Sequence, residues 1–220
     1  MPVWRLVVRF VLGIAVTAAA LFLPAWTFDY WQAWVLLAVL FVPFAFVGAY
    51  FMKRSPEFLA RRMQYKEKRG SQQWFVAASG FLFALAFLMP GMDVRLGWSV
   101  VPTWLVLLAD IVVLVSYALV FAAFRANAYA ARTVEVMAGQ KVIDTGPYAI
   151  VRHPMYAGII PMLLVIPLAL GSFWALIPVV LACALIIPRL LDEERLLRSS
   201  LPGYAEYCTR VKFRLIPRVW

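Results

Sequence analysis

The residues best suited to chemistry gather in one stretch, Asp144-Thr-Gly-Pro-Tyr-Ala-Ile-Val-Arg-His-Pro-Met-Tyr-Ala-Gly158. It contains the only histidine of the chain, His153, with an arginine and two tyrosines, between long apolar segments. Gly146-Pro147 and His153-Pro154 interrupt a continuous helix, because proline lacks an N–H donor and pushes the preceding residue towards extended backbone. Irregular backbone at membrane depth is tolerated where protein or a water-filled cavity satisfies its polar groups. The stretch therefore predicts a shaped pocket.

A second group of charged residues follows at Arg189, Glu193 and Glu194. Arg189 and Glu193 are four residues apart and so share one helix face. One interpretation is a solvated surface ion pair worth about a few tenths of a kcal/mol, and the other is a charged pair at the pocket. Tyr204 and Tyr207 recur further on, at a spacing that returns a short helix to the same surface.

Common catalytic patterns are missing from the sequence. One histidine cannot build a multi-histidine metal site, so no metal is expected. The chain also has no glycine-rich phosphate loop, Gly-x-Ser-x-Gly elbow or cysteine pair with metal-ligand spacing. Cys183 and Cys208 are interpreted as two unpaired thiols.

The elements that must position these residues are membrane helices. A chain with 65% hydrophobic and 15% charged residues is far more apolar than a soluble domain, which predicts an all-α integral membrane protein. About six spans are expected, and only Gly171-Ser172 separates the last two, which predicts a tight helical hairpin. The expected spans are Leu6–Trp26, Trp31–Met52, Trp74–Pro90, Val100–Phe124, Tyr156–Gly171 and Phe173–Leu191.

The net charge of +10 is explained by the topology of the membrane helices rather than by nucleic-acid binding. If the N-terminus is cytoplasmic, every lysine and arginine except Arg95 lies on the cytoplasmic side, as the positive-inside rule requires. Both termini are therefore expected in the cytoplasm, with anionic lipid attracted to that face. As a separate expectation, the membrane is a bacterial inner membrane rather than the endoplasmic reticulum. The sequence does not indicate an oligomeric state.

Two further features leave alternatives open. Ser55-Pro56-Glu57 suits the start of a short surface helix, although a basic loop that sets topology is the simpler interpretation. Asp110 lies well inside the fourth span, where a carboxylate costs about 2.5–3.5 kcal/mol and usually has a partner or a cavity. Residues 1–73 are interpreted as an N-terminal transmembrane hairpin with a basic loop, and residues 74–220 as a catalytic core.

Four motifs in order resemble the signature of the isoprenylcysteine carboxyl methyltransferase family and its bacterial relatives, a group also similar to phospholipid methyltransferases. The resemblance covers about the C-terminal half, from Thr133 to the end, and leaves the first two spans outside it. The motifs are Gly146-Pro-Tyr148, Arg152-His-Pro-Met-Tyr-Ala-Gly158, Glu193-Glu194-x-x-Leu197 and Tyr204-x-x-Tyr207-x-x-x-Val211-x-x-Arg214-x-x-Pro217.

This resemblance implies S-adenosyl-L-methionine as cofactor, held in a pocket near the cytoplasmic face, with a lipid-like substrate that reaches the methyl group from the membrane. Arg189 is implied to meet the substrate's carboxylate, and Glu193 to bind the cofactor, with Glu194 as the substitute if the register shifts by one. Together with His153, Arg189 and Glu193 form the implied catalytic group. The residues implied at the adenosine end are Gln140, Lys141, Val142, Ile143 and Tyr148, and those at the methionine portion are His153, Pro154, Met155 and Tyr156.

Physical chemistry agrees with these roles. Methyl transfer from a sulfonium is an in-line displacement, so the protein must mainly supply alignment and exclude water. An ionised carboxylate needs no general base, whereas an amine acceptor would require one from His153, Glu193 or Glu194. Carboxylate, thiol and amine acceptors all stay open.

Two rival functions stay open as well. NADPH-dependent sterol reductases have a similar Arg-His-Pro-x-Tyr-x-Gly ending, but commonly an acidic residue follows the glycine and the spans are more numerous. Here Ile159 follows Gly158, and the chain is short. The second rival is a non-catalytic membrane scaffold that binds lipid or nucleotide in the same pocket.

Overall fold

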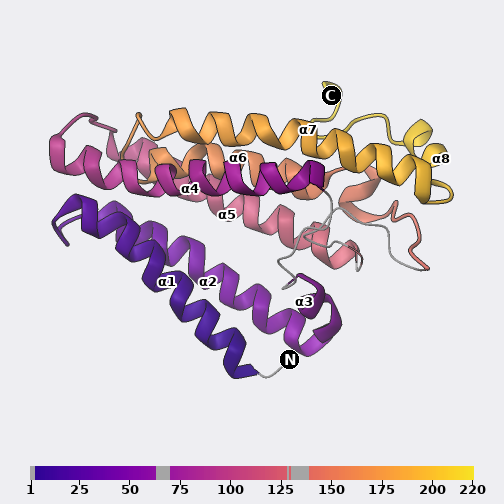
Figure 1. Cartoon of the computed structure of the whole chain (residues 1–220), viewed down its shortest axis with the longest axis horizontal. Helices are drawn as coiled ribbons and strands as arrows, with labels where there is room; N and C mark the ends of the chain where they lie inside the picture. Colours follow the sequence, from indigo (N-terminus) through magenta and orange to yellow (C-terminus); the bar gives the residue numbers. More distant parts are fainter. Residues whose placement is uncertain (1–2, 63–69, 128, 130–138) are drawn as a thin grey trace.

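The computed structural model describes residues 3–62, 70–127, 129 and 139–220, and every regular element in these residues is helical. The expected all-α class is confirmed. The helices are α1 (Val3–Ala25), α2 (Trp31–Arg54), α3 (Pro56–Arg62), α4 (Gly70–Leu96), α5 (Thr103–Ala126), the 3-10 helix η1 (Gly146–Ala149), α6 (Pro154–Ala169), α7 (Leu176–Ser200) and α8 (Tyr204–Arg210) (Figure 1).

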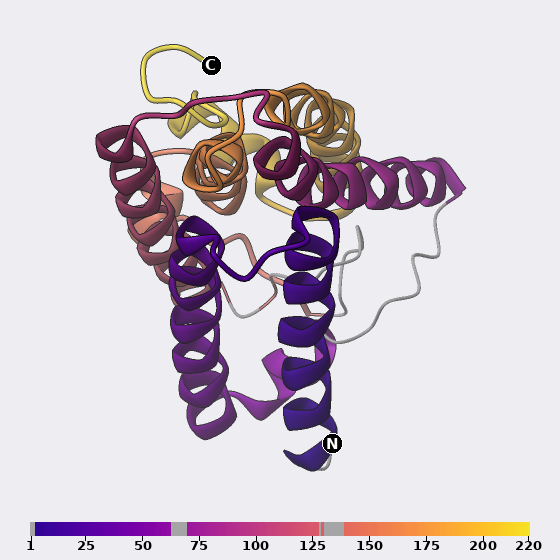
Figure 2. The same ribbon diagram turned by 90° about the vertical axis from the view of Figure 1, so that its left-hand side faces the viewer.

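Helices α4 to α7 run side by side as a long bundle, and the α1–α2 hairpin diverges from it (Figure 1). Near its loop end the hairpin packs through α1 against α4 and through α2 against α5. Figure 2 shows α1 and α2 leaving the bundle together, with α3 lying between their far ends. The hairpin therefore touches the bundle closely at one end and opens away from it at the other.

Four helices are long and apolar enough to cross a membrane, over Trp4–Ala25, Trp31–Arg54, Trp74–Leu96 and Thr103–Ala126. Helix α6 is apolar but shorter, and α7 passes from an apolar first half into the charged run that begins at Asp192. The chain is thus an integral membrane protein, as the composition predicts. The last two helices form the expected hairpin, but α7 begins at Leu176 rather than at Phe173, because the residues from Gly171 to Ala175 are used in the turn.

The helices alternate in direction, so that every second loop lies at the same end of the molecule (Figure 1). Residues 55–62, 139–153 and 201–220 lie at the same end, here called the basic end. At the opposite end, Asp93 is fully buried and accepts hydrogen bonds from Ser99 N, Ser99 Oγ and Ser172 Oγ. This carboxylate joins the α4–α5 loop to the α6–α7 turn.

Gly158 allows α6 to lie directly against α5. A Cβ at this position would stand 2.7 Å from Val120 Cγ2 and 3.1 Å from the carbonyl oxygen of Ser116. Real Cβ atoms do not approach a neighbour that closely, so any side chain would force the two helices apart. The glycine of the Arg152–Gly158 motif thus sets the position of the first turn of α6.

The short surface helix at Ser55-Pro56-Glu57 is present as α3, which begins at Pro56.

Asp110 is buried in α5, and both of its carboxylate oxygens lack a hydrogen-bond partner among the described residues. Cys183 and Cys208 are both free thiols.

Candidate functional site

A cavity of about 280 Å³ lies at the basic end of the bundle. Its wall is built from the end of α3, the residues after α5, the segment from Gln140 to Ile143, the start of α6, the charged half of α7, and α8. Together with Tyr148 of η1, these separate parts of the chain meet around one space. Pro154 starts α6 here, where a residue without an N–H donor costs the helix nothing.

The hydroxyl of Tyr156 lies between two opposite charges in this cavity. It donates a hydrogen bond to Glu193 Oε2 at 3.0 Å, and Arg189 Nε donates to it at 3.3 Å. Because Arg189 and Glu193 are four residues apart on α7, both side chains reach the same hydroxyl of α6. The guanidinium of Arg189 also lies over the ring of Phe75 in α4, 5.0 Å from its centre. The pair therefore faces the pocket rather than solvent.

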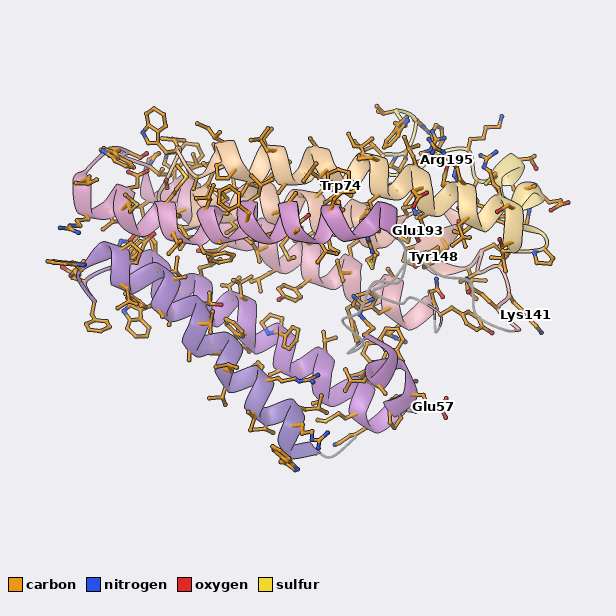
Figure 3. The ribbon with its side chains drawn as sticks, viewed as in Figure 1. Glu57, Trp74, Lys141, Tyr148, Glu193 and Arg195 are labelled. Atoms are coloured by element: carbon orange, nitrogen blue, oxygen red, sulfur yellow. The ribbon has the colours of Figure 1, made fainter. Side chains whose placement is uncertain are left out.

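Figure 3 shows Glu193 and Tyr148 lying near each other beside the charged half of α7. Arg195 lies on the other side of α7 and is exposed. Lys141 stands at the outer edge of the site, where it is exposed, although it still contributes to the cavity wall. The cavity therefore passes from a charged inner part to an exposed rim.

Glu194, the next residue along α7, points away from the cavity and is only 3% exposed. Its carboxylate accepts hydrogen bonds from Arg152 Nε at 2.7 Å, Arg214 Nε at 3.0 Å and His153 Nε2 at 3.3 Å. Burial raises the pKa of this carboxyl, but the hydrogen bonds from His153 and Arg214 and the charges of His153 and Arg152 lower it further, to about 2. Glu194 is therefore an ionised anchor for the stretch that carries His153. Since an ionised carboxylate only accepts hydrogen bonds, His153 Nε2 is the donor in this contact.

The C-terminal segment is fastened to the same stretch through its backbone. Arg152 N donates to Phe213 O and His153 N to Arg214 O, both at 2.9 Å. The Arg152 side chain also donates to the carbonyl oxygens of Val211 and Lys212 at 3.2 Å. These hydrogen bonds thus join two segments of the site that lie about 60 residues apart in sequence.

Three tyrosines form one side of the cavity. Tyr207 donates to the carbonyl oxygen of Tyr148 at 2.7 Å, and the rings of Tyr204 and Tyr207 lie 5.6 Å apart. Burial raises the pKa of Tyr148 to about 12 and raises the pKa of Tyr204 and Tyr207 as well, so all three hydroxyls are neutral at physiological pH. The Tyr204 hydroxyl is buried without a hydrogen-bond partner among the described residues, so it is free to bind a water molecule or a ligand atom.

The structure brings together nearly all of the residues that the sequence suggested. Pro154 is an exception among the suggested residues. It is fully buried as the first residue of α6 and does not line the cavity. Asp110 does not line it either. The suggested residues in the wall are Gln140, Lys141, Val142, Ile143, Tyr148, His153, Met155, Tyr156, Arg189 and Glu193.

Sequence reasoning missed Arg62, Asn127 and Tyr129, which also line the cavity. Arg62 belongs to the basic loop that was interpreted as topogenic, and no local pattern separates it from its basic neighbours. Asn127 directly follows the last residue of α5. Tyr204 and Tyr207 were signalled by their spacing, although no ligand role was assigned to them.

Comparisons with known proteins find a similarity to one family in the part of the chain that holds most of this site. Residues 104–199 match the family model described as the isoprenylcysteine carboxyl methyltransferase (ICMT) family. The match begins in α5, includes the stretch 144–158 and the pair on α7, and ends before α8. The region therefore starts earlier than the sequence motifs suggested and does not reach the tyrosines of the C-terminal segment.

A second comparison finds a shorter similarity. Over 91 residues the chain is 32% identical to the Delta(14)-sterol reductase TM7SF2 of Mus musculus. The alignment takes in 40% of this chain and 22% of the reductase, so the chain spans less than a quarter of that relative. Residues 104–199, which hold most of the cavity wall, are therefore similar to the isoprenylcysteine carboxyl methyltransferase family.

Proposed function

We propose that this protein is a membrane methyltransferase that uses S-adenosyl-L-methionine and methylates a lipid-like carboxylic acid at the basic end of the bundle. The observation that carries the proposal is the Tyr156 hydroxyl, which holds Arg189 and Glu193 in one cavity within the family segment. A cation and an anion fixed a few ångströms apart suit two ligands, one with an anionic and one with a cationic group.

The cavity fits the proposed cofactor. The Tyr204 hydroxyl is a buried neutral donor without a partner in the described chain, so it suits a ribose or adenine acceptor. Glu193 offers negative charge to ribose hydroxyls or to the cofactor's ammonium group, and Tyr148 offers a ring face for the adenine. When bound, S-adenosyl-L-methionine supplies a methyl group on a positively charged sulfur.

The acceptor is proposed to bind at Arg189. A guanidinium matches the planar geometry of a carboxylate, and charge-assisted hydrogen bonds orient it strongly. A carboxylate is already ionised at neutral pH, so its oxygen can form the new O–CH₃ bond while the S–CH₃ bond breaks, with no proton to remove. Tyr156 holds the Arg189 Nε group, and the half-buried site limits competition from water.

His153 is proposed to act by position. Its Nε2 faces the ionised Glu194, and its backbone N–H binds the C-terminal segment. The ring therefore shapes the cavity wall close to the start of α6. If the acceptor were an amine, His153 or Glu193 would be the candidate base.

A sterol-type reductase that uses NADPH is the second candidate, and the 91-residue similarity to the mouse reductase favours it. A non-catalytic lipid-binding scaffold is a third. The proposed setting is the same for all: N- and C-termini in the cytoplasm of a bacterial inner membrane, with anionic lipid at the basic end. We also propose that the chain divides into an N-terminal part of residues 1–73 and a catalytic core of residues 74–220.

The test is transfer of label from methyl-labelled S-adenosyl-L-methionine by detergent-purified protein. Acceptors would be a long-chain fatty acid, a prenylated cysteine derivative, and the matching alcohol, thiol and amine. Label that mild base releases as methanol identifies a methyl ester. The proposal expects base-labile label with the carboxylic acids, reduced at least about tenfold in Arg189→Gln. Oxidation of NADPH with a sterol acceptor, without methyl transfer, would instead establish the reductase.

A further inference from the structure

A second cavity, of about 570 Å³, lies where the α1–α2 hairpin opens away from the bundle. Its wall comes from the first half of α1, the second half of α2, α3 and the end of α5. Most of the wall is apolar and much of it is aromatic, including Phe10, Phe44, Phe51, Phe58 and Phe124. All of these residues lie outside the family segment except Phe124.

Arg62 belongs to the walls of both cavities. Its guanidinium lies over the ring of Phe124, 4.1 Å from the ring centre, and its Nη1 lies 4.0 Å from Met155 Sδ. Phe124 lines the second cavity and Met155 lines the first. Arg62 therefore stands at the junction between an apolar space and the polar site.

The second cavity is open because small residues occupy the helix faces that border it. Small residues usually let membrane helices approach closely. Here a Cβ added to Gly48 would find no atom within 4 Å, and one added to Gly13 would reach only Phe41, at 3.7 Å. The small residues thus leave space between α1 and α2 rather than close it.

The chemistry of this space selects one class of occupant. The volume lies within the range of about 300–1,000 Å³ that is common for small-molecule sites. Lining residues on α2 run from Phe41 to Met52, which is about 16 Å along the helix axis. Arg9 and Arg62 are the charged residues that the described wall contains, and both are cations. A long apolar wall with cationic groups matches a single hydrocarbon chain that ends in an anionic head.

We propose that the cavity between α1, α2 and α3 holds the hydrocarbon tail of the methyl acceptor, and that Arg62 positions its anionic head at the entrance to the polar site. This inference rests on the proposed methyltransferase function for the identity of the acceptor. Arg62 binds the head during entry, and Arg189 receives it in the polar cavity. Exposed residues of the wall, such as Phe44 and Met52, give the tail direct access from the lipid phase.

The test uses the full chain in lipid nanodiscs and a photoreactive hexadecanoic acid with a diazirine near mid-chain. Labelled peptides are mapped by mass spectrometry and compared with those from the matching alcohol probe. The expected result is labelling of α1 and α2 that is stronger for the acid than for the alcohol. Arg62→Gln is expected to remove that preference for the acid.

Gly48→Phe supplies the blocking variant, and Gly80→Phe is its matched control. A Cβ at Gly80 in α4 also meets no atom within 4 Å, and Gly80 lines neither cavity. Gly48→Phe is expected to lower labelling of α1 and α2 about tenfold, because the ring fills space that several methylenes need. Gly80→Phe is expected to leave it unchanged. Equal labelling in both variants, equal labelling by acid and alcohol, or labels spread over all lipid-facing helices would overturn the proposal.

Binding of S-adenosylhomocysteine to the same samples separates this inference from the proposed function. If the nucleoside binds to wild type and to Gly48→Phe while the acid labels neither α1 nor α2, the tail site alone is wrong. If the acid labels α1 and α2 as expected but the nucleoside does not bind, the tail site stands and the methyltransferase function fails.

Discussion

The hydroxyl of Tyr156 donates a hydrogen bond to Glu193 Oε2 at 3.0 Å, across the contact between α6 and α7. This hydrogen bond orients the carboxylate of Glu193, which lines the cavity, whereas Glu194 does not line it. The neighbouring carboxylate of Glu194 is used for a different purpose, since it binds Arg152, His153 and Arg214. Two adjacent acids therefore divide ligand binding and assembly of the site between them.

Tyr156→Phe is expected to weaken the binding of S-adenosylhomocysteine about tenfold, because Glu193 loses a donor and Arg189 loses one acceptor. Isothermal titration calorimetry measures this effect. Tyr117→Phe is the matched control, since the Tyr117 hydroxyl donates to Leu40 O and Tyr117 does not line the cavity. Equal affinity in wild type and Tyr156→Phe would contradict the role given to this hydroxyl.

Glu194→Gln is expected to destabilise the protein by about 3–5 kcal/mol, because removing one partner leaves the buried Arg152 charge without its counter-ion. The thermal midpoint in detergent and the rate of proteolysis of the C-terminal segment report the loss. Glu206→Gln is a suitable control, since Glu206 is exposed on α8. If the C-terminal segment stays protected in Glu194→Gln, the anchoring role is wrong.

The same carboxylate of Glu194 makes the stability of the folded protein depend on pH in the acid range. Folding lowers the pKa of Glu194 from 4.5 to about 2, so its ionised form stabilises the folded protein. That contribution is fully present above the ordinary pKa and is lost as the pH falls from about 4.5 through about 2. The difference in thermal midpoint between wild type and Glu194→Gln should therefore shrink across this range. A difference that stays constant with pH would contradict the lowered pKa.

Gly158→Ala is expected to cost about 1–3 kcal/mol, because the new methyl group would stand 2.7 Å from Val120 Cγ2. Moving α6 away from α5 also shifts Tyr156, so affinity for the cofactor analogue should fall as well. Gly80→Ala provides the comparison, since its Cβ position is open. Similar thermal midpoints for the two variants would show that α6 and α5 are less tightly packed than the structure indicates.

The sequence predicted the membrane class, the α6–α7 hairpin and most of the cavity wall, because hydropathy and the order of polar motifs act locally. It could not decide between Glu193 and Glu194. Adjacent positions on a helix point about 100° apart, and which one faces the cavity depends on the packing of α7 against α6. Pro154 was assigned to the cofactor through its place in a motif, whereas its structural use is to start α6.

Arg62 illustrates a different limit. It lies 93 residues before Met155, with which it makes contact, and it is one of several basic residues in its loop. Its position depends on how the α1–α2 hairpin diverges from the bundle. No local sequence pattern predicts that divergence. The sequence does not predict the apolar cavity beside Arg62 either, since Gly48 resembles any small residue of a packed membrane helix.

Calorimetric titration of S-adenosyl-L-methionine and, separately, NADPH into detergent-purified protein tests the methyltransferase function at the level of cofactor binding. His153→Ala and Glu193→Ala are the site variants, and Glu57→Ala, an exposed position on α3 away from the cavity, is the control (Figure 3). Saturable binding of S-adenosyl-L-methionine is expected for wild type and Glu57→Ala and is expected to be lost in both site variants. Binding of NADPH alone would show that the protein is a reductase and not a methyltransferase.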